Sequence, residues 1–260
     1  MGLTPWDAWT VSDPEAPRDR HWFEPMAEHM GAAYLRYSFT RGTTQEVDFL
    51  IEELGLSSGM RVLDVGCGPG RHTAELASRG IETHGIDISP RFIEIARSDP
   101  PAGATYERAD ALEMTYESEF DAAISICQGA FGLAAMPGAP VPSVDPDGRI
   151  LARMAAAVRP GGGVAVSAFS AYFQVCHLEA GERFDFDHGV NHERTTLRNE
   201  AGDESEHDLW TSCFTPRELR LLASIAGLDV KAIWSVSPGR YSRKAPGADD
   251  PEYLLIAQRR

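Results

Sequence analysis

The chain has 260 residues, 43% of them hydrophobic, and its 24 basic and 39 acidic residues give a formal net charge of −15. This length suits one α/β domain with a sizeable core. The negative charge repels phosphate backbones and anionic membranes, so it disfavours nucleic acid and membranes as partners. The sequence has no leader-like N-terminus and no apolar run of about 18 residues, which predicts a cytoplasmic protein.

The first 42 residues are expected to form an arm or lid over a domain that occupies residues 43–260. Residues 1–21 are rich in Pro, Asp and Arg and predict irregular structure, and residues 22–37 are expected to be helical. A better-marked helix follows. Thr43 and Glu46 have the spacing of a capping box, and apolar residues recur at helical intervals until Gly55.

Strands and helices alternate in the next part of the chain. Strands are predicted over residues 61–65, 81–88, 105–108, 121–126 and 164–169, and helices begin near residues 71, 90 and 146. Short strands separated by helices of this length imply right-handed crossovers and a mainly parallel sheet. The fold class is therefore α/β, a Rossmann-like doubly wound sheet with helices on both faces.

The last third of the chain departs from this alternation. Residues 171–213 are predicted to be an insertion that contains a hairpin of strands 190–198 and 205–214. A capping box of Thr215 and Glu218 begins another helix. The final strands, 229–236 and 252–258, have no crossover helix between them, so they are expected to be antiparallel.

One glycine-rich turn carries most of the functional information. Residues 62–72 read VLDVGCGPGRH, an apolar strand that enters a turn with glycines at 66, 68 and 70 and then a helix. Such a turn lets a ligand approach the backbone closely at the crevice where α/β sheets bind nucleotides. The GxGxG spacing differs from the GxGxxG of dinucleotide-binding dehydrogenases. Asp64 precedes the turn, where it would disfavour a pyrophosphate and favour an amino group.

Carboxylates also follow the next two strands. Asp87 lies about 20 residues after the turn, where an acidic residue accepts hydrogen bonds from ribose hydroxyls. Asp110 follows the third strand, where it can accept a hydrogen bond from the amino group of an adenine. Three acidic residues at three successive strand ends together favour an adenosyl cofactor with a positively charged end.

These motifs resemble those of the class I S-adenosylmethionine-dependent methyltransferases. VLDVGCGPG is similar to the first motif of that family, GIDIS to its ribose-binding strand end and ADALEM to its adenine-binding segment. The resemblance implies a seven-stranded sheet with one antiparallel strand near the C-terminus, and S-adenosylmethionine as cofactor. The cofactor-binding residues expected are Asp64, Gly66, Cys67, Gly68, Gly70, Asp87, Ile88, Asp110, Ala111, Leu112, Cys127 and Gln128. The resemblance implies that Cys127 or Gln128 lies beside the methyl-bearing sulfur.

The acceptor is expected to contact segments that overhang the strand ends. These are the N-terminal aromatic stretch, the Gly- and Pro-rich residues 127–144, read as a flap or a plain connector, and the insertion. The expected pocket residues are Trp22, Phe23, Tyr34, Tyr37, Phe131, Phe169, Tyr172, Phe173 and Trp210. Packing within the core is the alternative reading of these aromatic residues. His177, His188 and His192 are candidate general bases because imidazole titrates near neutral pH.

The predicted activity is methyl transfer to a small molecule at O, N or C, by displacement at a sulfonium and with alignment as the main source of catalysis. No metal is expected, since the cysteines at 67, 127, 176 and 213 are widely spaced. The alternatives are a protein or tRNA-component methyltransferase, a non-catalytic S-adenosylmethionine-binding partner protein and an NAD-dependent oxidoreductase. The sequence leaves open whether the protein is a monomer or a homodimer.

Overall fold

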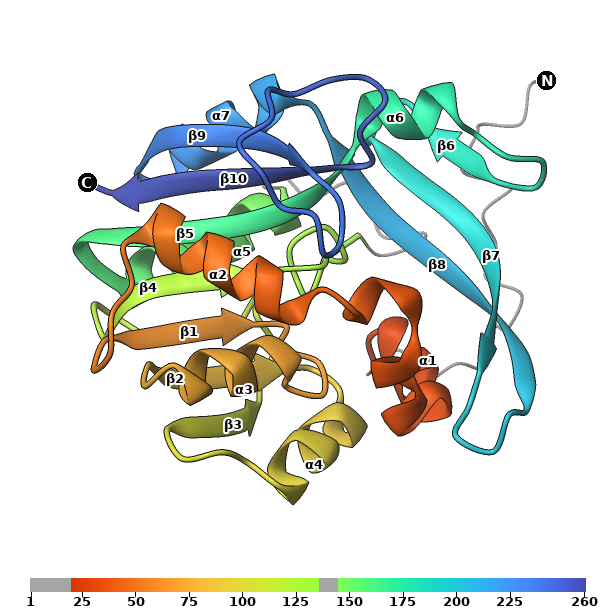
Figure 1. The fold of residues 1–260 in the computed structure, drawn as a ribbon. Coiled ribbons are helices and arrows are strands. Elements are labelled where there is room, and N and C mark those ends of the chain that lie inside the picture. Colours follow the sequence, from red (N-terminus) through yellow and green to blue (C-terminus); the bar gives the residue numbers. More distant parts are fainter. Residues whose placement is uncertain (1–19, 136–144) are drawn as a thin grey trace.

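The computed structural model describes residues 20–135 and 145–260. Its centre is a twisted sheet with strand order β3-β2-β1-β4-β5 (Figure 1). The five strands are β1 (Arg61–Val65), β2 (Glu82–Asp87), β3 (Ala104–Arg108), β4 (Phe120–Ser125) and β5 (Val158–Ser170). All pair in parallel, so their carboxyl ends meet along one edge of the sheet. This confirms the predicted doubly wound architecture.

The antiparallel closing pair is also confirmed. Strand β10 (Glu252–Arg259) lies between β5 and β9 (Leu228–Val236) and runs antiparallel to both. Because β10 runs opposite to β5, its first residue, Glu252, pairs with Phe169 near the end of β5. The start of β10 therefore lies at the same edge of the sheet as the ends of the parallel strands.

The predicted count of seven strands is wrong, because the sheet has ten within the described residues. The additional strands are β6 (Arg183–Asp185), β7 (Val190–Arg198) and β8 (Glu204–Phe214). Strands β7 and β8 form the expected hairpin, and β8 joins the main sheet by pairing Cys213 and Phe214 with the last two residues of β5. The hairpin thus extends the sheet beyond the strand ends (Figure 1).

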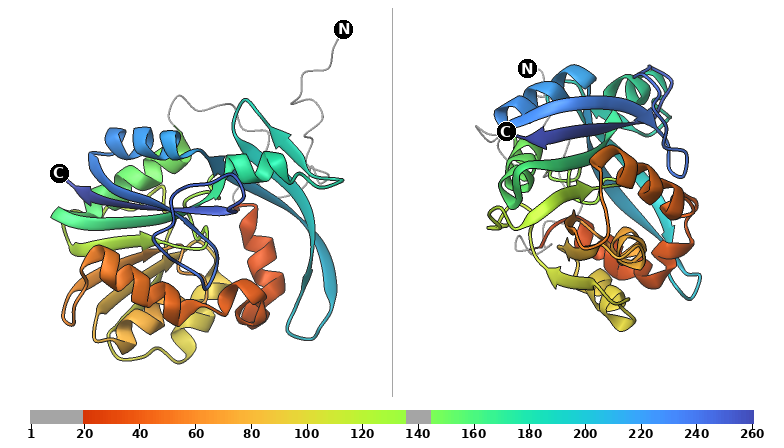
Figure 2. Two further views of the ribbon diagram at one scale, coloured as in Figure 1. Left: turned by 45° about the horizontal axis from the view of Figure 1, so that its top comes forward. Right: turned by 60° about the vertical axis from the view of Figure 1, so that its left-hand side comes forward.

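Helices cover both faces of the sheet, and each face has its own apolar core (Figure 2). Helices α2 (Thr43–Leu54), α3 (Arg71–Ser78) and α4 (Pro90–Ser98) lie on one face. Helices α5 (Pro146–Ala157) and α7 (Pro216–Ile225) lie on the other, and the short α6 (Ala171–Cys176) follows β5. The capping box of Thr215 and Glu218 is present at α7.

The capping box predicted for α2 is wrong. Gly42 is the N-cap of α2, and no side chain caps this end. The Glu46 carboxylate instead turns toward α3, where Arg71 and His72 bind it. A carboxylate forms stronger hydrogen bonds with a buried arginine than with the backbone N–H groups at the exposed end of its own helix.

The N-terminal helical segment is divided rather than continuous. Helix α1 (Phe23–Met30) ends at Gly31, which has a φ of 49°, and the 3₁₀ segments η2 (Gly31–Arg36) and η3 (Ser38–Thr40) follow. Figure 1 shows α1 between α4 and the β7–β8 hairpin, and it packs against both. Across the two described ranges, no helix is long and apolar enough to span a membrane, and no cluster of three potential metal ligands occurs.

Candidate active site

The loop after β1 is held by backbone contacts to two neighbours. The Gly66 and Cys67 N–H groups both donate to Ile86 O of β2, at 2.8 and 2.9 Å. Gly66 has a φ of +74°, and a Cβ on it would lie 2.0 Å from the Gly129 carbonyl carbon. The loops after β1 and β4 therefore touch through two glycine backbones, which only residues without side chains allow.

Six of the predicted cofactor residues line one cavity beside this contact. Gly66, Asp87 and Asp110 come from the ends of β1, β2 and β3, and all three line it. Its other lining residues are largely apolar and include the predicted Ile88, Ala111 and Leu112, with Ile86, Ala109, Gly129, Ala130, Leu133, Ala134 and Ile150. A cavity lined by apolar groups and two carboxylates has the chemistry of a nucleoside site.

Asp87 is a buried residue that lines this cavity. Its Oδ2 accepts a hydrogen bond from Gly68 N–H and its Oδ1 accepts one from Ser89 N–H, both at 2.8 Å. Burial raises the pKa of Asp87 to about 6, although these two hydrogen bonds act in the opposite direction. Each oxygen retains a second lone pair, so the carboxylate can still accept two hydroxyl groups.

Asp110 and two N-terminal residues also line the cavity. Asp110 is exposed, and its Oδ1 accepts a hydrogen bond from Leu112 N–H at 2.8 Å. His21 and Phe23 face the same space, and burial lowers the pKa of His21 although Asp110 and Glu24 oppose this shift. Phe23, predicted to contact the acceptor, lines the same cavity as Asp87 and Asp110. The sequence motifs gave no signal for His21.

Other predicted cofactor residues make contacts that hold the loop after β1 in place. The buried Asp64 carboxylate accepts a hydrogen bond from Thr73 Oγ1 of α3 at 2.7 Å. The Cys67 sulfur packs so closely on Gly85 that a Cβ there would lie 2.8 Å from it. A Cβ on Gly70 would similarly meet the Tyr106 ring. These contacts fix the shape of the loop.

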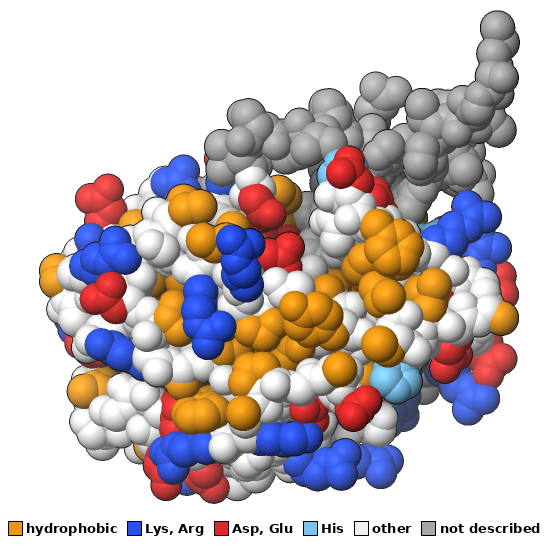
Figure 3. Space-filling view, turned by 90° about the horizontal axis from the view of Figure 1, so that it is seen from above, with side chains coloured by type: hydrophobic (Ala, Val, Ile, Leu, Met, Phe, Trp, Pro, Cys, Tyr) orange, Lys and Arg blue, Asp and Glu red, His pale blue; other side chains and the backbone are white. Residues whose placement is uncertain are grey.

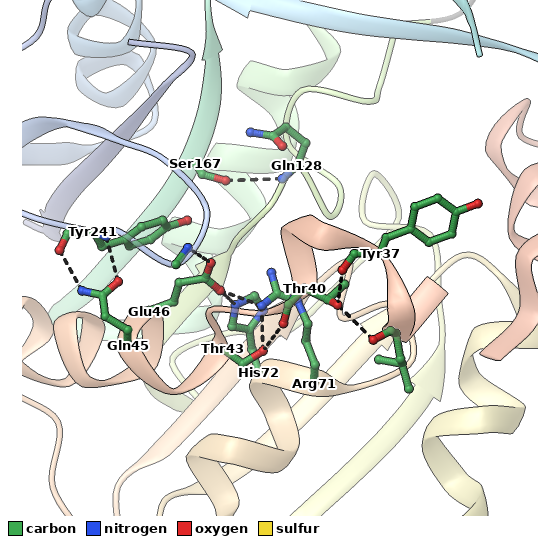
Figure 4. Close-up of polar contacts among 12 residues, drawn as sticks. Tyr37, Thr40, Thr43, Gln45, Glu46, Arg71, His72, Gln128, Ser167 and Tyr241 are labelled. Atoms are coloured by element: carbon green, nitrogen blue, oxygen red, sulfur yellow. Dashed lines mark hydrogen bonds and ion pairs between the residues drawn. The ribbon is translucent and has the colours of Figure 1, made fainter. Parts of the chain in front are cut away.

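A buried ionic cluster, absent from the predicted site, lies between α2 and α3 (Figure 4). Glu46 Oε2 accepts hydrogen bonds from Arg71 Nη1 at 2.6 Å and from His72 Nε2 at 2.8 Å. Burial raises the pKa of Glu46, but His72 and Arg71 together lower it to about 2. Burial and the Arg71 charge lower the pKa of His72, so a neutral imidazole donates to Glu46.

The two terminal nitrogens of the Arg71 guanidinium differ in their hydrogen bonding. Its side chain is 7% exposed, and Nη1 also donates to Thr43 Oγ1 at 2.9 Å, whereas Nη2 is buried and has no hydrogen-bond partner among the described residues. Tyr34 and Cys127 lie close to this guanidinium. Buried donors are normally satisfied, so Nη2 points to a missing anionic or polar ligand.

The turn after β4 borders this cluster. Cys127 and Gln128 both adopt left-handed backbone conformations, with φ of 58° and 49°, and Gln128 N–H donates to Ser167 Oγ of β5 at 3.3 Å. Glu252 of β10 lies next to the Gln128 side chain. Both side chains are buried, and Gln128 Nε2 and Glu252 Oε2 have no hydrogen-bond partner in the described part of the chain. Glu252 lies outside every motif of the sequence.

The aromatic residues expected in the acceptor pocket separate into distinct groups. Trp22 and Trp210 form an edge-to-face pair with ring centroids 5.5 Å apart, which joins α1 to β8. Tyr34 contacts Phe92, and Tyr37 Oη accepts a hydrogen bond from Arg198 N–H. Phe131 is fully buried and stacks on Phe214, so it belongs to the core. The remaining three lie along the end of β5 and on α6: Phe169, Tyr172 and Phe173.

The three histidines proposed as bases all lie in the insertion and already have partners. His177 is exposed and stacks on Phe173. His188 Nδ1 lies 2.7 Å from Asp185, and His192 Nε2 lies 2.9 Å from Asp208. None of the three lines the cavity of Asp87 and Asp110.

The upper face of the molecule as drawn in Figure 1 carries exposed apolar groups. Figure 3, which views this face, shows hydrophobic side chains gathered across its middle, between charged ones. The exposed large side chains of the insertion are Tyr172, Val175, Leu178 and Phe186. Tyr172 and Val175 belong to α6, Leu178 follows it, and Phe186 follows β6.

The comparisons with known proteins agree with this geometry. Residues 62–162 match the model of a methyltransferase domain family. The chain also has the fold of the CcbJ methyltransferase from Streptomyces caelestis, with a TM-score of 0.68 at 17% identity over 84% of this chain and 89% of that one. Residues 62–162 therefore belong to a methyltransferase domain. The chain as a whole has the fold of S-adenosylmethionine-dependent methyltransferases.

Other similar proteins are likewise methyltransferases. The methyltransferase fold is shared with CalS10, an amino pentose methyltransferase from Micromonospora echinaspora solved with S-adenosylmethionine, with a TM-score of 0.59 at 20% identity over 88% of this chain and 95% of that one. O-methyltransferase cnsE of Penicillium expansum is 38% identical over 30% of this chain and 33% of its own. Trans-aconitate 2-methyltransferase of Methylobacterium nodulans is 35% identical over 35% of each. The chain thus spans about a third of the length of these two relatives.

Proposed function

We propose that the protein transfers a methyl group from S-adenosylmethionine to a small-molecule acceptor. The observation that carries this proposal is that Gly66, Asp87 and Asp110 line one cavity, although they come from three separate strand ends. Names of the curated relatives, such as trans-aconitate 2-methyltransferase, support a small acceptor. The net charge of −15 argues against nucleic acid.

The residues present suit the cofactor at each of its parts. Asp87 would accept hydrogen bonds from the two ribose hydroxyls, and Asp110 would accept one from the adenine amino group. Gly66 would let the ligand approach the backbone closely. The unpartnered Nη2 of Arg71 would donate to the carboxylate of the methionine part, which satisfies a buried donor.

The chain contributes alignment and the exclusion of water. When bound, S-adenosylmethionine supplies an electrophilic methyl group on a sulfonium whose carbon–sulfur bond breaks with its electron pair remaining on sulfur. Helix α1 and the hairpin lie beyond the carboxyl ends of the strands (Figure 1), where they would restrict solvent access. Holding the nucleophile at a near-attack distance of about 3–3.5 Å accounts for much of the rate enhancement.

Calorimetry tests the cofactor part of the proposal. S-adenosylhomocysteine and NAD are titrated separately into the full chain under the same conditions. We expect binding of S-adenosylhomocysteine and none of NAD. Binding of NAD alone would overturn the proposal in favour of a dehydrogenase.

Label transfer tests the acceptor part. The protein is incubated with methyl-labelled S-adenosylmethionine and a cell extract separated into metabolite, protein and tRNA fractions. We expect the label in the metabolite fraction. Label in protein or tRNA would overturn the small-molecule assignment. S-adenosylhomocysteine binding without label in any fraction would favour a non-catalytic partner protein.

A further inference from the structure

Glu252 is a buried carboxylate without a counterion of its own. It is 5% exposed, and its Oε2 has no hydrogen-bond partner among the residues that the structure describes. The charged or titratable groups that face it are Glu46 of α2, Arg71 of α3, Cys127 after β4 and Tyr241 before β10.

These neighbours leave the Glu252 charge uncompensated. The Arg71 charge is matched by Glu46, which lies 2.6 Å from it. Burial raises the pKa of the Cys127 thiol to about 12 and raises the pKa of Tyr241 well above its usual value, so both are neutral. A buried carboxylate in such surroundings is costly unless a ligand supplies a positive charge or a hydrogen-bond donor.

The position of Glu252 points to the acceptor end of the site. The ribose and adenine residues lie at the ends of β2 and β3, on one side of β1. Glu252 pairs with Phe169 of β5, two strands away on the other side of β1, and lies next to Gln128 after β4. Gln128 Nε2 is also buried and has no partner within hydrogen-bond distance among the described residues, although it lies near enough to Glu252 to lower the pKa of that carboxyl. A donor and an acceptor thus face each other beyond the adenosyl end of the site without a full hydrogen bond between them.

We propose that Glu252 and Gln128 bind the nucleophile of the acceptor, that this nucleophile is an amine, and that Glu252 Oε2 accepts its proton. This inference rests on the proposed methyl transfer. An amine reaching the site as an ammonium supplies the charge that Glu252 lacks. It gives one proton to Glu252, which becomes a neutral carboxylic acid, and the freed lone pair forms the new bond to the methyl carbon. The electron pair of the broken carbon–sulfur bond stays on sulfur.

Burial of Glu252 suits it to this role. It raises the pKa of the carboxyl to about 7, against the opposing effect of the nearby Gln128 amide. A base with a pKa near neutrality is ionised often enough to accept a proton and basic enough to draw one from an ammonium. The histidines of the insertion are not required for this step.

Two cofactor analogues test the proposal without knowledge of the acceptor. S-adenosylhomocysteine is uncharged at sulfur, whereas sinefungin carries an ammonium where the sulfonium and its methyl group would be. We expect sinefungin to bind the native protein about tenfold more tightly, because its ammonium meets the Glu252 charge. In Glu252→Gln this preference should disappear while the affinity for S-adenosylhomocysteine stays the same. Glu206→Gln, at an exposed position of β8, is the matched control and should keep the preference.

Each of the other results of the analogue-binding experiment has its own interpretation. An unchanged preference in Glu252→Gln overturns the proposal. Equal weakening of both analogues also overturns it, because Glu252 would then hold the amino acid part of the cofactor that the two analogues share. Failure of the native protein to bind either analogue contradicts the proposed function itself. A panel of amines and alcohols with labelled cofactor then tests the acceptor class, and label on alcohols alone would overturn the choice of an amine.

Discussion

Glu46 Oε2 accepts hydrogen bonds from both Arg71 Nη1 and His72 Nε2, and its other oxygen accepts one from Gly239 N–H. One carboxylate thereby joins α2, the start of α3 and the loop before β10. It holds Arg71 in a fixed orientation with Nη2 free to donate. The geometry of the proposed methionine end therefore depends on a residue that contacts no ligand.

Removing one partner of the ion pair between Glu46 and Arg71 should destabilise the folded protein. Arg71→Met leaves the Glu46 charge buried and uncompensated, so we expect the free energy of unfolding to fall by about 3–5 kcal/mol. The double variant Glu46→Gln, Arg71→Met removes both charges and should recover part of the loss. Urea unfolding measures both variants. Equal destabilisation of the single and double variants would show that the charge pair is not the cause.

Acid should lower the stability of the folded protein by protonating Glu46. The pKa of Glu46 is about 2 in the folded protein, below its ordinary 4.5. Its ionised form therefore stabilises the fold fully above pH 4.5, and this contribution is lost as the pH falls toward 2. Thermal unfolding across this range should show a steeper decline for the native chain than for Glu46→Gln. Parallel curves would contradict the assignment.

Glu252 should have the opposite pH dependence. Burial raises its pKa from 4.5 to about 7, so its contribution to stability is lost as the pH rises through this window. Glu252→Gln should therefore be more stable than the native protein at a pH of about 8, by ~1–3 kcal/mol. The unliganded proteins are compared by urea unfolding, with Glu206→Gln as the control. A less stable Glu252→Gln variant would indicate a partner that the structure does not show.

Ligand affinity should follow the ionisation of Asp87. Asp87→Ala should weaken S-adenosylhomocysteine binding by about 1–3 kcal/mol, since two ribose hydroxyls lose their acceptor. With a pKa of about 6, the native carboxylate should protonate as the pH falls below this value, and the affinity should decrease with it. Calorimetry at several pH values measures both effects. An unchanged affinity in the alanine variant would mean that the ribose lies elsewhere.

The hairpin should hold the N-terminal helical segment in place. At the hairpin tip, Glu200 Oε1 accepts hydrogen bonds from Ala32 N–H, at 2.7 Å, and from Arg91 Nη2, at 3.0 Å. Glu200→Ala should speed amide hydrogen exchange across η2 and leave the central strands unchanged. Glu204→Ala, which removes a hairpin carboxylate paired only with Arg198 in the described contacts, is the control. Equal exchange in both variants would rule out this connection.

The elements with local signals were predictable from the sequence. Short local patterns predicted the GxGxG turn, the alternating strands and the capping box of Thr215 and Glu218. The structure contains all of them. The same rules misplaced Glu46, because a residue spacing cannot show that a buried arginine from another helix offers the better partner. Glu252 gave no signal, since its role depends on β10 lying beside β5.

The acceptor side was harder to predict for a related reason. Phe23 and Phe131 are both aromatic and near the predicted site, but one borders the cavity and the other is enclosed in the core. Composition cannot separate these two environments. The predicted flap includes residues 136–144, which lie outside the described ranges, and its role stays a prediction, as does that of the arm over residues 1–19.

The contact between Gly66 and Gly129 restricts how this sequence can vary. A Cβ on Gly129 would lie 2.1 Å from Gly66 O, and a Cβ on Gly66 would strike Gly129 in turn. Neither loop can gain a side chain here unless the other retreats, and retreat would reshape the cavity wall that both form. Among homologous chains with this backbone, the two positions should therefore be inherited as a pair, and a change at one should accompany an altered length or path of the other loop.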